Sequence, residues 1–125
     1  MDTLLSFYPR LCQAGFVPVE EWIMSGEALH FPYPRYHPDV TAFIEIAGKP
    51  VWCDYDYIPS EAFGMLSDPE RVANANLMQV KTMLTYVVRG ERFADGHWAA
   101  MIEHGYLCRL LERIAKLREM EDGKD

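Results

Sequence analysis

The chain has 125 residues, half of them hydrophobic and a quarter charged, which is the size and balance of one folded domain. This composition excludes disorder of the whole chain, because a chain of this size buries enough apolar surface to form a core. The net charge of −7 opposes contact with a phosphate backbone, so direct nucleic-acid binding is disfavoured and another protein, preferably a basic one, is the expected partner.

The N-terminal part of the chain predicts short helical pieces. Asp2 and Thr3 can cap a first helix through their side-chain oxygens. Pro9 should kink this helix or end its first part, and Gly15 is a natural stop. Residues 20–24 predict one more helical turn before a serine and a glycine.

The next stretch, residues 29–38, reads LHFPYPRYHP and predicts an extended arm of aromatic residues and prolines. Proline removes a backbone donor and pushes the residue before it into extended geometry, so a helix is excluded here. The aromatic rings should hold the arm against the body. Pro38 then opens a helix that ends at Gly48. Residues 51–58 alternate in polarity but have no obvious partner strand, so an extended loop is expected, followed by a short helix over residues 60–66 that Ser60 caps.

Two long helices are predicted in the C-terminal half. The sequence Asp68-Pro69-Glu70 supplies a cap, a first-turn proline and an acid, and its helix should run to about Val88. A second helical region follows the Asp95-Gly96 turn, and Gly105 either admits another backbone or divides this region in two. Both regions repeat apolar residues every three or four positions, namely Ala73, Leu77, Val80, Leu84 and Val87, then Trp98, Met101, Ile102, Leu107, Leu110, Leu111, Ile114 and Leu117. We therefore expect an all-α, mostly helical single domain over residues 1–125, with the two long C-terminal helices packed as an antiparallel pair.

The cysteines and the apolar segments bear on location. Cys12, Cys53 and Cys108 are odd in number and far apart, so three free thiols are expected rather than a disulfide framework or a zinc site. No stretch approaches the roughly 18 apolar residues that a membrane span needs. The sequence therefore predicts a cytoplasmic protein that does not enter a membrane.

One segment, from Arg89 to Trp98, gathers charged residues, glycines and an imidazole between the two predicted helices. Loops held by rigid helices often carry function, so this segment is the leading candidate for a binding or catalytic site. With two aspartates from an earlier loop, the candidate ligand-binding or partner-binding residues are Asp54, Asp56, Arg89, Glu91, Arg92, Asp95 and His97. His97 could act as a general base if a carboxylate oriented it.

A structural role for the same segment is an equally concrete hypothesis. Arg89 suits the C-terminal end of a helix, and Asp95 can cap the helix that follows. Phe93 and Trp98 can fill the core below the turn. The fork-shaped guanidinium of Arg92 is predicted to pair with a carboxylate, the candidates being Glu91, Asp95, Asp54 and Asp56.

Two roles are open to the aspartate pair, namely a metal site and carboxylates that are solvated or paired with arginine. Asp54 and Asp56 lie on one face if their segment is extended, and their oxygens could hold a hard cation. The flanking residues lack the pattern of a calcium loop, so solvated or arginine-paired carboxylates are expected, with Arg89 and Arg92 as possible partners. The four histidines form no metal motif, and no glycine loop of the phosphate-binding type is present. The sequence predicts no metal and no cofactor.

A resemblance appears over residues 82–114. The order of Arg89, the Glu91-Arg92-Phe93 run, the Asp95-Gly96 turn, Gly105 and the Leu110-to-Arg113 run resembles a family of small bacterial proteins known only as a domain of unknown function. The upstream segment WCDYDY, residues 52–57, is similar to longer members of that family. The resemblance implies a mostly helical fold and no established activity.

The function therefore stays unknown at the level of sequence. Small size, acidity and the absence of a recognised catalytic pattern favour a protein-interaction or regulatory module, inhibitor-like in character, over an enzyme. The alternative hypothesis is a small hydrolase-like enzyme or ligand-binding domain that uses Asp54, Asp56 and the cluster from Arg89 to His97. Convergence of these side chains in one hollow would favour the alternative.

Overall fold

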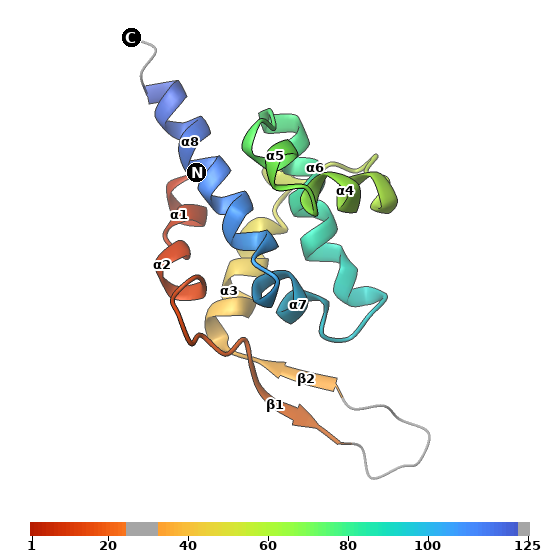
Figure 1. The fold of residues 1–125 in the computed structure, drawn as a ribbon. Helices are drawn as coiled ribbons and strands as arrows, with labels where there is room; N and C mark the ends of the chain where they lie inside the picture. Colours follow the sequence, from red (N-terminus) through yellow and green to blue (C-terminus); the bar gives the residue numbers. More distant parts are fainter. Residues whose placement is uncertain (25–32, 123–125) are drawn as a thin grey trace.

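The structure, a computed structural model, describes residues 1–24 and 33–122, and most of these residues are helical (Figure 1). The helices and strands are α1 (Asp2–Leu5), α2 (Tyr8–Leu11), β1 (Val19–Ile23), β2 (Tyr33–Tyr36), α3 (Pro38–Ala47), η1 (Pro50–Trp52), α4 (Pro59–Leu66), α5 (Pro69–Ala73), α6 (Leu77–Arg89), η2 (Gly90–Arg92), α7 (His97–Glu103) and α8 (Tyr106–Asp122), where η marks a 3₁₀ turn. The mostly helical fold expected from the sequence is confirmed.

Helix α8 is the element around which the others are arranged. It contacts α1 and α2 on one side and α5, α6 and α7 on the other, while its C-terminal end extends past the body (Figure 1). Its residues Leu110, Leu111 and Ile114 are fully buried, as are Val80 and Leu84 of α6. The apolar stripes predicted for these two helices therefore form the centre of the core, and the antiparallel pairing of the long helices stays a prediction.

The prediction of a helical turn over residues 20–24 is wrong, because residues 20–23 belong to strand β1. β1 pairs antiparallel with β2, with Val19 opposite Tyr36 and Ile23 opposite Tyr33. An ion pair of 3.0 Å between Arg35 and Glu21 links the two strands. The β-branched and aromatic residues of β1 favour a strand once a partner is present, and that partner comes from the proline-rich arm. The fold is therefore not all-α. The structure does not describe residues 25–32, which include residues 29–32 of the predicted arm.

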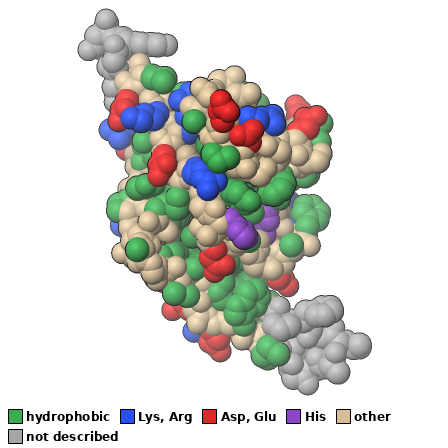
Figure 2. All heavy atoms as spheres, viewed as in Figure 1, with side chains coloured by type: hydrophobic (Ala, Val, Ile, Leu, Met, Phe, Trp, Pro, Cys, Tyr) green, Lys and Arg blue, Asp and Glu red, His purple; other side chains and the backbone are tan. Residues whose placement is uncertain are grey.

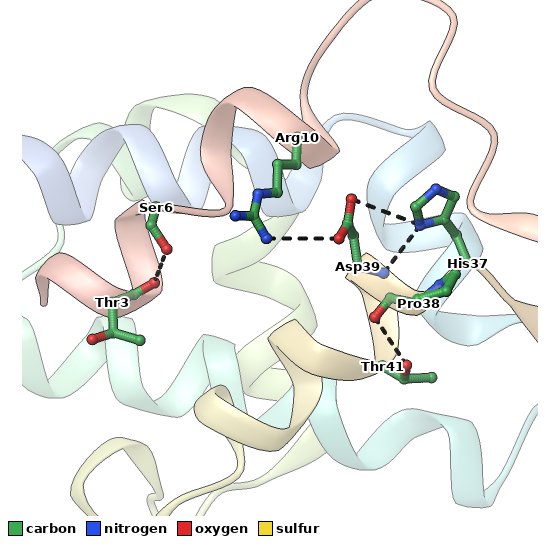
Figure 3. A network of polar contacts seen from close by, with 7 residues as sticks. All are labelled: Thr3, Ser6, Arg10, His37, Pro38, Asp39 and Thr41. Atoms are coloured by element: carbon green, nitrogen blue, oxygen red, sulfur yellow. Dashed lines mark hydrogen bonds and ion pairs between the residues drawn. The ribbon is translucent and has the colours of Figure 1, made fainter.

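The start of α3 shows how the first helices are attached (Figure 3). Pro38 occupies the first turn of α3, as predicted, and the backbone N–H of Asp39 donates to Nδ1 of His37 at 3.0 Å. Arg10 of α2 lies 3.7 Å from the Asp39 carboxylate. An acid in the first turn is favoured by the helix dipole, so Asp39 stabilises its own helix while it holds α2 in place.

The helix predicted from Asp68 to Val88 is divided in two. Asp68 caps α5 as expected, accepting from the N–H groups of Glu70 and Arg71, but α5 ends at Ala73. Asn76 then starts α6 with a capping box, because its side chain and that of Gln79 each accept from the other's backbone N–H at 2.8 and 2.9 Å. The break leaves Ala73 outside the core and Leu77 39% exposed. Helix α4 begins at Pro59, and Ser60 does not cap it, contrary to the expectation. Gly105, at φ 79°, separates α7 from α8, which is one of the two outcomes expected for it.

A disulfide contradicts the prediction of three free thiols. Cys12, at the end of α2, is bonded to Cys108, in the first turn of α8, and Cys53 is free. The two partners are 96 residues apart in sequence, and only the packing of α2 on α8 brings them together. Free thiols therefore no longer support a cytoplasmic location, which stays a prediction. Within residues 1–24 and 33–122, no helix has the length and apolar content to cross a membrane.

The disulfide predicts a stability difference that can be measured. We expect thiol titration of the denatured, non-reduced protein to detect Cys53 alone. Replacing Cys12 and Cys108 with serine should lower the free energy of unfolding by about 4–5 kcal/mol, because a loop of roughly 100 residues is no longer closed in the unfolded chain. Cys53→Ser serves as the matched control and should leave the denaturation midpoint nearly unchanged. Titration of all three thiols would contradict the bond.

Candidate functional site

The segment from Arg89 to Trp98 is organised by the carboxylate of Glu91. One oxygen, Oε1, accepts from the Tyr36 hydroxyl at 2.7 Å and from the backbone N–H of Trp98 at 2.9 Å. The other oxygen, Oε2, accepts from the N–H of Gly96 at 2.8 Å. Glu91 therefore caps α7, because it satisfies two N–H groups at the helix start that would otherwise have no partner. The sequence assigned this capping role to Asp95, which is wrong, since Asp95 is exposed and forms no cap.

Tyr36 and Trp98 complete this arrangement from β2 and α7. Their rings lie 5.0 Å apart, and the indole N–H of Trp98 donates to the Val88 carbonyl at 2.9 Å. Burial, together with the hydrogen bond to the Glu91 carboxylate, raises the pKa of Tyr36 well above its ordinary value. A tyrosine held in its neutral form is a permanent donor, so the contact is a fixed connection between the sheet and the loop. Sequence reasoning missed Tyr36 because its partner lies 55 residues away.

His97 is packed as a structural residue. Its Nε2 lies 3.2 Å from the Tyr86 carbonyl oxygen, and because a carbonyl can only accept, this nitrogen carries the proton. The ring packs edge-on against Tyr86 at 5.0 Å, and it occupies the space that a side chain at position 90 would need, which explains Gly90. Burial lowers the pKa of His97, although the Tyr86 carbonyl and the Glu91 carboxylate partly oppose this shift. The Nε2–H bond to the backbone fixes the position of the ring, and a general-base role for His97, which stays a prediction, would fall to Nδ1.

The aspartate pair is separated from this cluster and attached to α6. Asp54 accepts from the Thr82 hydroxyl at 2.7 Å, and its own N–H donates to the Thr85 hydroxyl at 2.9 Å. The same carboxylate accepts from the N–H of Asp56 at 3.0 Å, which closes a turn. Asp54 thus holds its loop on α6. Asp56 is exposed, and no group of three histidine, cysteine, aspartate or glutamate side chains able to hold a metal ion occurs among the described residues.

Arg89 ends α6, as predicted, but neither Arg89 nor Arg92 pairs with a carboxylate in the described part of the chain. Arg89 lies 5.6 Å from the ring of Tyr55 and 5.6 Å from that of Tyr57. It therefore makes cation–π contacts with the loop of residues 53–58 that carries the two aspartates, named here the aspartate loop. Arg92 is exposed and forms no ion pair with any carboxylate in the described part of the chain, contrary to the expected pairing. The connection between the segment and the distant loop therefore runs through Arg89 and aromatic rings.

The predicted site residues do not converge. Glu91 and His97 lie together and are used for structure, Asp54 and Arg89 hold a second loop, and three exposed side chains complete the set, namely Arg92, Asp95 and Asp56. Surface hollows occur elsewhere: one lies between α5 and α8, and another lies between the first helices and α8.

A cluster of aromatic rings lies next to the segment from Arg89 to Trp98 and was not predicted from the sequence. Phe63 of α4 lies 5.8 Å from Tyr86 and 6.0 Å from Tyr106, measured between ring centroids. His104 lies 5.6 Å from Tyr106 on the other side. These residues come from three helices and from the turn before α8, and they share no motif. The signal in the sequence was the high content of tyrosine and phenylalanine, with 7 and 6 residues.

Comparison with known proteins gives a family and nothing more specific. The model of a family described as "Family of unknown function (DUF6508)" matches residues 1–120. No curated protein and no solved structure matches the chain. The motif around the Glu91-Arg92-Phe93 run as the mark of this family, and a bacterial origin, stay predictions.

The geometry around Glu91 predicts a large effect on stability. Glu91→Ala should lower the free energy of unfolding by about 2–4 kcal/mol, because a charged acceptor with three donors is removed. Arg92→Ala should change it by less than about 0.5 kcal/mol, since the side chain is exposed. Glu103→Ala, which removes an exposed carboxylate from the other end of α7, is the control. Chemical denaturation measures all three, and a neutral Glu91→Ala would refute the capping role.

The surroundings of His97 predict a pH dependence. The folded protein holds the His97 pKa below the unfolded value of about 6.5, so the unfolded chain binds more protons as the pH falls through that value. The contribution of neutral His97 to stability is therefore present above pH of about 6.5 and is lost as the pH falls through the folded pKa. We expect NMR titration to place the His97 pKa below the unfolded value. His97→Gln should weaken the loss of stability in acid, and a His97 pKa above that of the unfolded chain would contradict the prediction.

Proposed function

The chain belongs to the DUF6508 family of unknown function, and we propose that it is a protein-binding module that acts through an exposed aromatic face. This face, named here the aromatic face, consists of rings from the aspartate loop and from α4, α6, α7 and α8. Its members are Tyr55, Tyr57, Phe63, Tyr86, His97, His104 and Tyr106. Figure 2 shows hydrophobic and histidine side chains together on the side turned to the viewer.

The exposure of the aromatic face is the observation that supports this proposal. Tyr55 is 66% exposed and Phe63 is 40% exposed. Phe63 contacts the rings of Tyr86 and Tyr106, whereas Tyr55 contacts the guanidinium of Arg89. The ring contacts continue from Tyr86 to Tyr57, which is close enough to contribute to the raised pKa of Tyr86, after burial and Tyr106. From there they reach Arg89 through the cation–π contact. Tyrosine, phenylalanine and arginine are the residues in which protein interfaces are enriched.

The rings are also ordered before any partner arrives. Each makes contacts with neighbouring rings or with a helix, so binding does not have to immobilise free side chains at an entropic cost. Aromatic side chains have few rotatable bonds and large surfaces, which makes them efficient contact residues. The small size and the acidity of the chain favour a regulatory or inhibitor-like protein that presents such a face.

An enzyme or a ligand-binding domain built on the candidate cluster has weaker support. That hypothesis needs Asp54, Glu91 and His97 to act on one bound molecule. Asp54 faces Thr82 and Thr85, whereas the Glu91 carboxylate is occupied by three donors and Nε2 of His97 by a backbone carbonyl. A polar group that already has its partners gains little from a ligand.

The proposal predicts that the ring of Phe63 is needed for the protein to bind its partner. We expect immobilised protein to capture a partner from extracts of the native host, and Phe63→Ser should reduce the recovered amount at least tenfold, since about 1.4 kcal/mol of lost contact suffices for that factor. Phe93→Ser is the matched control: Phe93 is 81% exposed and is not a member of the aromatic face. Circular dichroism should show both variants folded. Equal recovery by wild type and Phe63→Ser would refute the aromatic face as the binding surface.

A further inference from the structure

A groove between α5 and α8 lies next to the aromatic face. Its volume is about 560 Å³, and its apolar side is formed by Pro69, Val72 and Ala73. The opposite side is formed by cationic side chains of α8, namely Arg109, Arg113 and Lys116. Figure 2 shows lysine and arginine side chains along this part of the molecule. The groove thus combines an apolar wall with a row of positive charge on a chain whose net charge is −7.

The cations are arranged in a row and two of them are held in place. Positions 109, 113 and 116 are four and three residues apart, so they lie along one side of α8 at successive turns. The Nε–H of Arg113 donates to the Ala75 carbonyl at 2.8 Å, which leaves its other guanidinium donors available. Arg109 lies over the Tyr106 ring at 6.0 Å, and Tyr106 belongs to the aromatic face. The two surfaces therefore meet at Arg109.

One carboxylate, that of Glu112, also lines the groove, but it has a partner elsewhere. The Tyr8 hydroxyl of α2 donates to it at 2.8 Å, and this hydrogen bond raises the pKa of Tyr8. Lys116 also forms an exposed ion pair of 3.7 Å with Glu119, one turn further along α8. The three cations of the groove therefore exceed the two neighbouring carboxylates, and the groove keeps a positive charge centred on Arg109 and Arg113. At physiological salt, charges separated by more than about 8 Å are largely screened, so the local row and not the net charge decides what binds here.

We propose that this groove binds an acidic, apolar segment of the partner protein, beside the partner contact made by the aromatic face. The inference rests on the proposed function, and it corrects the expectation of a basic partner for this part of the surface. Carboxylates spaced along an extended or helical segment would meet Arg109, Arg113 and Lys116, while apolar side chains between them would lie on Pro69 and Ala73, which are exposed. Arginine bonds a carboxylate through two parallel hydrogen bonds, which favours carboxylates over neutral polar groups.

The test uses a synthetic helical peptide with glutamates spaced as the three cations are, leucines on the same face and a fluorescent label. A second peptide carries lysine in place of each glutamate. Fluorescence anisotropy on the full chain should show salt-sensitive binding of the glutamate peptide and no binding of the lysine peptide. The double variant Arg109→Glu/Lys116→Glu should lose at least tenfold in affinity for the glutamate peptide and gain affinity for the lysine peptide. Lys49→Glu/Arg92→Glu, with the same change of net charge at two exposed positions outside the groove, should bind as wild type does.

Each other outcome overturns the inference. Equal losses in the groove variant and in the control variant would show an effect of net charge alone. Tighter binding of duplex DNA than of the glutamate peptide, abolished by the groove variant, would assign the groove to phosphate. The capture experiment separates the two proposals. If Phe63→Ser loses the partner and the groove variant recovers it as wild type does, the groove alone is refuted. If both variants recover the partner as wild type does, the aromatic face is refuted as well.

Discussion

The carboxylate of Glu91 is the contact on which the arrangement of this molecule depends most. It accepts from the sheet through Tyr36 and from the start of α7 through two backbone N–H groups. One side chain therefore connects strand β2, whose Tyr36 is 55 residues away in sequence, with the start of α7, which follows only a few residues after Glu91. Hydrogen bonds to a charged carboxylate are stronger than hydrogen bonds to a neutral acceptor. Because Glu91 is half-buried, water would not fully replace these hydrogen bonds if the side chain were removed. The position of α7 in turn fixes His97 and the nearby rings of the aromatic face.

The sequence predicted features that depend on neighbouring residues and missed those that depend on distant ones. Pro38, Asp68 and Gly105 act within one turn of themselves, and the helix boundaries they indicate are present. The capping box of Asn76 and Gln79 was equally local, and it was overlooked because the apolar stripe on both sides suggested one continuous helix. Strand β1 required a partner, and its assignment failed because pairing is a property of two segments.

The candidate site illustrates the same limit. The segment around Glu91 connects distant elements, but its roles were predicted for the wrong residues. Asp95 was expected to cap α7, and Glu91 caps it. Arg92 was expected to reach the distant loop, and Arg89 contacts it. Side chains of similar chemistry a few positions apart cannot be told apart without the direction in which each points. The aromatic face and the groove of α8 were not predicted because their residues come from separate helices.

The bond between Cys12 and Cys108 has a consequence for the covalent integrity of the protein. It joins α2 to α8 and encloses α3 to α7 within one closed ring of chain. A protease that cuts once between the two cysteines opens the ring without releasing a fragment. The nicked molecule gains only the mass of the water used in the cleavage, and the disulfide still joins its two pieces. It can therefore retain its fold until a reductant separates them. In an oxidising compartment, a single cut would thus be silent in size and visible only after reduction.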